Sequence, residues 1–238
     1  DNHSSEDAGR VFSYQDISRL SKKDQKKAIE ETCSKLQASL NLQEGPIIRA
    51  NLFNLGDSQP QRLFIAIHHL AVDGVSWRIL LEDIQTLYTQ LQNNKLAQLP
   101  PKTTSFKEWS HKLIDYAQSD MLKEEASFWL SDIYQKPLSL PIDHPRKENT
   151  SESVAHILVS LTPKETKSLL SEVPKAYHTQ INDILLTALT LAISKWTRKD
   201  NILFNLEGHG REEVTEHTDL SRTIGWFTSL FPVSLTLP

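Results

Sequence analysis

Hydrophobic and polar residues follow two periodicities along the chain, and the two kinds of segment alternate. Ser21 and Asp24 resemble a capping box that opens an amphipathic helix ending near Leu40. Residues 47–55 and 63–69 are predicted strands, and the second is apolar almost throughout, as in a strand buried on both faces. After Asp73 and Gly74, apolar residues recur at helical spacing: Trp77, Leu80, Leu81, Ile84, Leu87 and Leu91. This alternation favours a mixed α/β fold.

The rest of the chain repeats the mixture around a proline-containing stretch. Two further helices are predicted from apolar spacing, and we expect their aromatic residues to be core residues: Phe106, Trp109 and Tyr116 with Leu113, then Phe128 and Trp129. Residues 136–153 are predicted to link two lobes, 1–135 and 154–238. The second lobe is predicted to hold a strand at 154–161, a helix opened by Thr162, Pro163 and Glu165, a helix from Ile181 to near Trp196, and strands at 202–206 and 231–237.

Composition excludes several classes of protein. The net charge of -4 over 238 residues does not provide the excess of positive charge that is typical of proteins binding nucleic acid or an anionic membrane. No apolar run approaches the ~20 residues of a membrane span, and the polar, acidic start is unlike a signal peptide. The single cysteine, Cys33, lies on a stripe with Ile29, Leu36 and Leu40, which predicts a buried core thiol rather than a nucleophile. A reducing, cytoplasmic setting fits this cysteine usage.

Two adjacent histidines, His68 and His69, end the second predicted strand. Because strand side chains alternate between faces, we expect their rings to point in opposite directions and only one to face a given cleft. The alternatives to a functional role are a pair of metal ligands and a core histidine whose hydrogen bonds are made within the protein. Diverging histidines chelate poorly, and no further metal ligands cluster nearby in the sequence, so no metal site is predicted.

A carboxylate and two glycines follow the predicted strand at 202–206. Glu207 stands at the strand end, and Gly208 and Gly210 let backbone or substrate approach closely. Taken alone, Glu207 is better explained as a turn carboxylate. His209 is either a turn residue or a cleft residue, and Arg211 is expected to hold this loop through an ion pair.

These motifs together resemble the epimerization branch of the condensation-type superfamily of nonribosomal peptide synthetases. His-His-x-x-x-Asp-Gly is the superfamily signature, and the Val-Ser-Trp-Arg that follows it and Glu-Gly-His-Gly-Arg-Glu are similar to the epimerization branch. Further segments match in the expected order: 140–143, 177–186 and 223–233. The resemblance implies a two-lobed, chloramphenicol acetyltransferase-like fold with the active site between the lobes. The family's opening segment and the later half of its second lobe are not found, so we expect a chain truncated at both ends, with its second lobe incomplete.

The resemblance implies inversion of the α-carbon of an aminoacyl or peptidyl thioester. His69 and Glu207 are the implied acid and base, in an order that the sequence leaves open. Asp73 is implied to be a structural anchor paired with an arginine, for which a place outside this chain is one option. Gly74 is expected to let the chain turn. Trp77 and Arg78 are candidates to lie beside the pantetheine tunnel, although core packing is the better interpretation of Trp77.

The implied partners are a peptidyl carrier protein domain and neighbouring synthetase modules. The carrier protein delivers a 4′-phosphopantetheine arm, and no cofactor is expected to bind to the domain itself. Two alternatives remain: a condensation domain that forms peptide bonds, and an inactive carrier-docking module. The Glu-Gly-His-Gly-Arg-Glu segment at 207–212 and the Val-Ser-Trp-Arg continuation argue against the first. The presence of both His69 and Glu207 argues against the second.

Overall fold

The computed structural model describes residues 9–131, 140–142, 150–212, 214 and 217–237, which form two compact units. The first unit contains the chain up to Gln118 together with His209–Ser229, and the second contains Ser119–Gly208 and Leu230–Pro238. The predicted lobe boundaries stay a prediction, because most of the predicted linker, 136–153, lies outside the described residues.

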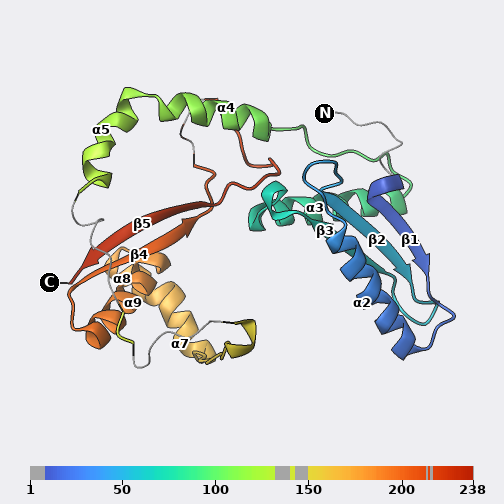
Figure 1. The fold of residues 1–238 in the computed structure, drawn as a ribbon, viewed down its shortest axis with the longest axis horizontal. Coiled ribbons are helices and arrows are strands. Elements are labelled where there is room, and N and C mark those ends of the chain that lie inside the picture. The colour runs from blue at the N-terminus through green and yellow to red at the C-terminus, as the bar shows by residue number, and fades with distance from the viewer. Residues whose placement is uncertain (1–8, 132–139, 143–149, 213, 215–216, 238) are drawn as a thin grey trace. The chain divides into compact units, whose positions relative to one another are not determined.

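A three-stranded sheet covered by one helix begins the first unit (Figure 1). Strand β1 (Phe12–Asp16) pairs in parallel with β2 (Ile48–Asn54), which pairs antiparallel with β3 (Arg62–Ile67). Helix α2 (Lys22–Ala38) connects β1 to β2 and packs on the sheet. Its N-cap is Ser21, as predicted, and the Ser21 side chain accepts a hydrogen bond from the Asp24 N–H.

The core under this helix is small and apolar. Ile17, Phe53 and Leu55 are buried together, and Cys33 packs against them from α2. Burial raises the pKa of the Cys33 thiol, which keeps it protonated at neutral pH. The interpretation of Cys33 as a core residue is therefore supported, although its side chain is only partly buried.

Strand β3 differs from its prediction in length and in burial. It ends at Ile67, and only Ala66 among its residues is buried, whereas a strand buried on both faces was predicted to reach residue 69. Within the described sheet, β3 is an edge strand that pairs with β2 alone, so one of its sides lacks a neighbouring strand. The apolar run of residues thus reflects strand propensity more than full burial.

The remaining part of the first unit contains a second core cluster. A short 3₁₀ helix, η1 (His69–Ala71), leads into α3 (Gly74–Gln92), and α4 (Phe106–Ala117) follows. Trp109 of α4 packs against Leu220 and Phe227, which come from a segment more than 100 residues later in the sequence. Trp109 is buried as predicted, but Phe106 is 39% exposed.

The second unit is mostly helical. Its elements are α5 (Asp120–Trp129), η2 (Ser151–Ser153), α7 (Pro163–Lys167), a π-helical turn η3 (Ser168–Glu172), α8 (Val173–Tyr177), α9 (Ile181–Thr197), β4 (Asn201–Gly208) and β5 (Ser229–Thr236). Strands β4 and β5 pair with each other, and α9 packs against β4, where Ile202 is fully buried. The predicted capping box is confirmed: Thr162 and Glu165 exchange side-chain and backbone hydrogen bonds at the start of α7.

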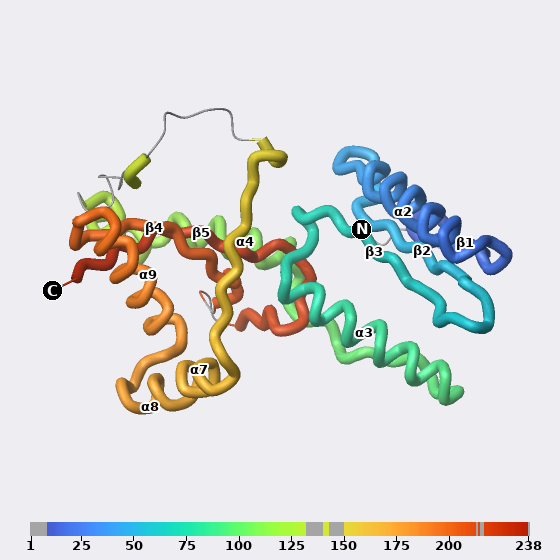
Figure 2. The backbone as a smooth tube through the Cα atoms, turned by 90° about the horizontal axis from the view of Figure 1, so that it is seen from below, coloured from blue at the N-terminus to red at the C-terminus, as the bar shows by residue number. Residues whose placement is uncertain are grey.

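Two predictions in this unit are wrong. Residues 154–161 form no strand but an extended run that leads into α7 (Figure 2). Ile157 and Leu158 in this run are more than 90% exposed. A strand requires a hydrogen-bonded neighbour, and no described strand pairs with this run. Phe128 and Trp129, predicted as core residues, are 57% and 40% exposed.

Candidate active site

The two histidines lie where the chain leaves β3, and they have different surroundings. The His68 N–H donates to the Ile47 carbonyl at 2.9 Å, and the His68 Nδ1 accepts from the Leu70 N–H at 3.2 Å. His68 is therefore the N-cap of η1. His69 is the first residue of that turn and is exposed. The expected strand alternation is wrong, because neither histidine is a strand residue. The two rings nevertheless lie in different environments.

The ring of His69 lies edge-on to an indole. Its centroid is 5.4 Å from that of Trp226, and the planes are inclined at 72°. Among the described residues, no hydrogen bond reaches the His69 ring. An exposed imidazole without a hydrogen-bond partner is available to exchange a proton with a bound substrate.

Asp73 is buried and caps the first turn of α3. Its Oδ1 accepts from the Ser76 N–H at 2.7 Å, and its Oδ2 accepts from the Phe227 N–H at 3.2 Å. The Nη2 of Arg211 lies 3.1 Å from Oδ1 and 3.3 Å from Oδ2. These donors match the anchoring role implied for Asp73. The arginine lies within this chain, so the option of a partner elsewhere is excluded.

Opposing effects act on the Asp73 carboxyl. Burial raises its pKa, but hydrogen bonds from Ser76 and Phe227, together with the positive charge of Arg211, lower it by more, so that the net pKa is below the ordinary value for aspartate. Asp73 is therefore ionised at neutral pH, and an acid–base role would require this ion pair to break.

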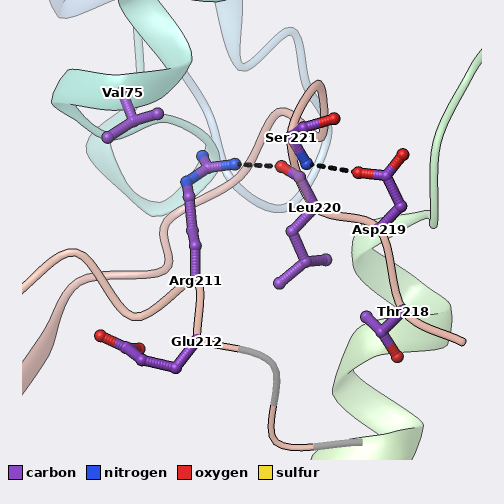
Figure 3. A pocket seen from close by; sticks show the side chains of 7 residues that line it. All are labelled: Val75, Arg211, Glu212, Thr218, Asp219, Leu220 and Ser221. Carbon is purple, nitrogen blue, oxygen red and sulfur yellow. Dashed lines mark hydrogen bonds between the residues drawn. The ribbon is translucent and has the colours of Figure 1, made fainter. Parts of the chain in front are cut away.

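The guanidinium of Arg211 donates hydrogen bonds to other groups of the same chain, including the Leu220 carbonyl (Figure 3). Its Nη1 donates to the carbonyls of Leu220 and Thr223 at 2.9 and 2.8 Å, and its carbon lies 4.0 Å from the centroid of the Phe227 ring. The side chain is only 8% exposed. The structure agrees with the expectation that Arg211 holds the loop through an ion pair.

The glycines of the second motif differ in what they permit. Gly210 has a φ of +66°, and a Cβ there would lie 1.6 Å from the Phe227 carbonyl oxygen. The loop that carries Arg211 thus passes too close to residue 227 for any side chain at position 210. Gly74 differs, because a Cβ there would meet nothing within 4 Å and its φ is not positive. The expected turning role of Gly74 has no basis in the backbone.

Most of the remaining motif residues are exposed. Glu207 is exposed near the end of β4, in the second unit, and is followed by Gly208. His209 belongs to the first unit, and its Nδ1 accepts from the Arg211 N–H at 3.0 Å, as expected of a turn residue. Trp77 is half-buried and Arg78 is exposed on α3.

A cavity of about 310 Å³ lies beside Arg211 in the first unit, and Figure 3 shows its lining residues: Val75, Arg211, Glu212, Thr218, Asp219, Leu220 and Ser221. Neither His69 nor Glu207 lines it. Hydrogen bonds from Ser221 lower the pKa of Asp219, against the weaker effect of burial.

Within the described ranges, no group of three or more histidine, cysteine, aspartate or glutamate residues is arranged to hold a metal ion. None of the described helices has the length and apolar character of a membrane span.

The sequence matches a known family over nearly its whole length. The family model of the condensation domain matches residues 5–237. The chain belongs to the condensation-domain family. It is 49% identical over 225 residues to a linear gramicidin synthase of Brevibacillus parabrevis, covering 94% of this chain and 4% of that protein. It is also 42% identical over 232 residues to tyrocidine synthase 1 of Brevibacillus parabrevis, covering 96% of this chain and 21% of that protein.

Solved condensation-family structures share this fold. The chain superposes with a TM-score of 0.78 and 38% identity on the epimerization domain from the third module of tyrocidine synthetase B, covering 95% of this chain and 50% of that one. The first condensation domain of the calcium-dependent antibiotic synthetase matches with a TM-score of 0.65 at 17% identity, again over half of that chain. The predicted mixed α/β, chloramphenicol acetyltransferase-like fold is confirmed, and this condensation-family chain spans about half the length of these domains and a few per cent of the linear gramicidin synthase.

Two residues of this domain have a place in the site that the sequence did not reveal. Ser76 is fully buried at the start of α3, and Trp226 contacts His69. Both stand inside segments that resemble family motifs, but the resemblance alone implies no role for either residue. Their roles depend on contacts between residues about 150 positions apart, which no local pattern discloses.

Proposed function

We propose that this domain inverts the α-carbon of an aminoacyl or peptidyl group held as a carrier-protein thioester. The supporting observation is the contrast between two similarities: 38% identity and a TM-score of 0.78 to an epimerization domain, against 17% and 0.65 to a condensation domain. The Val75–Arg78 continuation of the histidine motif also resembles the epimerization branch. The proposed activity is that of an isomerase.

The reaction needs a base on one face of the α-carbon and an acid on the other. A thioester acidifies its α-proton because the enolate that forms is stabilised, so positioned acid and base groups suffice. His69 and Glu207 are the proposed pair. His69 offers an exposed imidazole, and Glu207 offers an exposed carboxylate near the end of β4. One removes the α-proton and the other returns a proton on the opposite face.

The proposed partner is a carrier protein domain of the same synthetase. The substrate arrives on the carrier's 4′-phosphopantetheine arm, so that arm belongs to the substrate and is not a resident cofactor. The relatives that are peptide synthases, such as the linear gramicidin synthases, support a place in a multidomain peptide synthetase.

A condensation domain is the second candidate, because the family model carries that name and the histidine motif is common to both branches. The two functions differ in their need for an acceptor. We would load a carrier protein with an L-aminoacyl thioester, incubate it with the complete synthetase module, and release the amino acid for chiral chromatography. An epimerase converts the L form into an L/D mixture without an acceptor amine.

Matched variants test the proposed pair in the same assay. His69→Ala and Glu207→Gln should each slow inversion by about 100-fold or more, the scale for losing a positioned acid or base. His111→Ala and Glu152→Gln, exposed residues in the corresponding units, should leave the rate unchanged. Amide formation that requires an acceptor, with no D form in its absence, would instead assign this chain to condensation.

A further inference from the structure

The hydroxyl of Ser76 ties the start of α3 to a distant glycine. Ser76 Oγ donates to the Gly225 carbonyl at 2.9 Å and accepts from the Gly225 N–H at 3.1 Å. It also accepts from Arg211 Nη2 at 3.0 Å. A serine hydroxyl has one donor and two acceptor positions, so this fully buried group has its hydrogen-bonding capacity filled.

The residue on the other side of Trp226 is fixed as well. The Phe227 N–H donates to Asp73 Oδ2 at 3.2 Å, and the Phe227 ring packs edge-on against Phe106 with centroids 5.1 Å apart. Gly225 is crowded, since a Cβ there would lie 2.2 Å from the Phe106 ring. Both neighbours of Trp226 are therefore held by α3 and α4, and the segment has little room to shift.

The indole of Trp226 is partly exposed and contacts the ring of His69. Trp226 is 42% exposed, and its ring meets the ring of His69 at 5.4 Å in an edge-to-face arrangement. The backbone near His69 is fixed by the 3₁₀ turn that His68 caps, but the His69 ring has no hydrogen bond in the described part of the chain. The orientation of that ring about its side-chain torsions thus depends on the indole.

We propose that Trp226 is a positioning residue that holds the imidazole of His69, and that Ser76 keeps Trp226 in place through Gly225. Its catalytic consequence rests on the proposed function, because that function makes His69 an acid or base. The contact itself is independent of the reaction. Two measurements therefore test the contact and its catalytic effect separately.

The first measurement follows the reactivity of the His69 ring. The full-length protein is treated with diethylpyrocarbonate, and modification of each histidine is quantified by peptide mass spectrometry. His156, which is exposed in the second unit, serves as the internal reference. Trp226→Leu should raise the His69 rate relative to His156 by roughly 2- to 10-fold, the range expected for loss of one aromatic pair. Trp226→Phe, which keeps a ring, should stay near the wild-type rate. Unchanged reactivity in Trp226→Leu would overturn the proposal.

The second measurement follows inversion kinetics of the carrier-bound substrate. Trp226→Leu should lower kcat by about 10-fold at an unchanged KM, and Trp226→Phe should restore most of it, because positioning acts on the chemical step. A purely structural role would reduce the amount of folded protein and leave kcat per folded molecule unchanged, which would contradict the proposal.

Ser76→Ala tests the anchor without removing either ring. It should raise His69 reactivity and lower kcat in the same direction as Trp226→Leu. The control is Ser119→Ala, which removes the N-cap hydrogen bond of α5 in the second unit and should affect stability but not His69. If Ser76→Ala behaves like this control, the anchor role is refuted. If wild-type protein shows no inversion, the proposed function fails, while His69 reactivity still decides whether Trp226 holds the ring.

Discussion

Asp73 and His69 stand four residues apart, yet the fold uses them in opposite ways. The carboxylate of Asp73 is 4% exposed and receives hydrogen bonds from Ser76, Phe227 and Arg211. The imidazole of His69 is exposed and contacts an aromatic ring. One motif thus contains both a buried anchor and the proposed catalytic histidine. The two differ because the protein supplies hydrogen-bond partners for Asp73 and none for the His69 ring among the described residues.

Asp73→Asn tests this anchoring role at the level of stability. Because removal of one partner leaves Arg211 buried and uncompensated, we expect a loss of about 3 kcal/mol or more in the free energy of unfolding at neutral pH, measured by urea denaturation. Asp219→Asn is the control, since Asp219 also has a lowered pKa but no ion pair with an arginine in the described residues.

The same variant should change how stability depends on pH. The pKa of Asp73 is lower in the folded protein, so its contribution is fully present above the ordinary aspartate value of about 3.9 and is lost as pH falls through the folded-state pKa. Wild-type protein should therefore lose more stability than Asp73→Asn below about pH 4. Thermal melts across this range with parallel curves for the two proteins would refute the assignment.

At the scale of elements, the second motif depends on a close crossing of two backbone segments. Gly210 passes under residue 227 with a left-handed backbone, and a Cβ would collide with a carbonyl oxygen that cannot rotate away. Gly210→Ala should thus destabilise the protein by about 2 kcal/mol or more. Gly74→Ala is the matched control within the first motif. It begins α3 in open space, so it should be neutral or stabilising by up to about 1 kcal/mol. Equal denaturation midpoints for Gly210→Ala and wild type would contradict this account.

Local signals predicted the helices better than the strands. Ser21 and Thr162 are the N-caps of α2 and α7, as predicted. Such caps can be predicted from local sequence because their contacts lie within one turn of the chain. The apolar run at 154–161 was predicted as a strand, but a strand also requires a neighbour, and local sequence does not specify one. Strand β1 was missed, since Phe12–Asp16 alternates only weakly. His68 and His69 were predicted to belong to a strand that in fact ends at Ile67, two residues before its predicted end.

At the scale of the whole molecule, the chain returns to its first unit late in the sequence. Arg211 pairs with Asp73 across 138 positions, and Ser76 reaches Gly225 across 149. All of these residues stand in segments that resemble family motifs. The resemblance also predicted the fold class, which the comparisons confirm. It did not reveal the Ser76–Trp226–His69 connection, because motifs record identity along the chain and not contacts between segments.

The proposed function predicts one event that condensation does not require, which is loss of the α-proton to solvent. The decisive measurement is deuterium at the α-carbon of a carrier-bound L-aminoacyl thioester, incubated with the complete module in heavy water without an acceptor amine. We expect deuterium to appear at the α-carbon together with the D enantiomer, and His69→Ala and Glu207→Gln to slow the inversion by about 100-fold or more. A variant that retains exchange from a single enantiomer would identify the face that its residue serves. Amide formation with an acceptor and no α-deuterium in its absence would contradict the account.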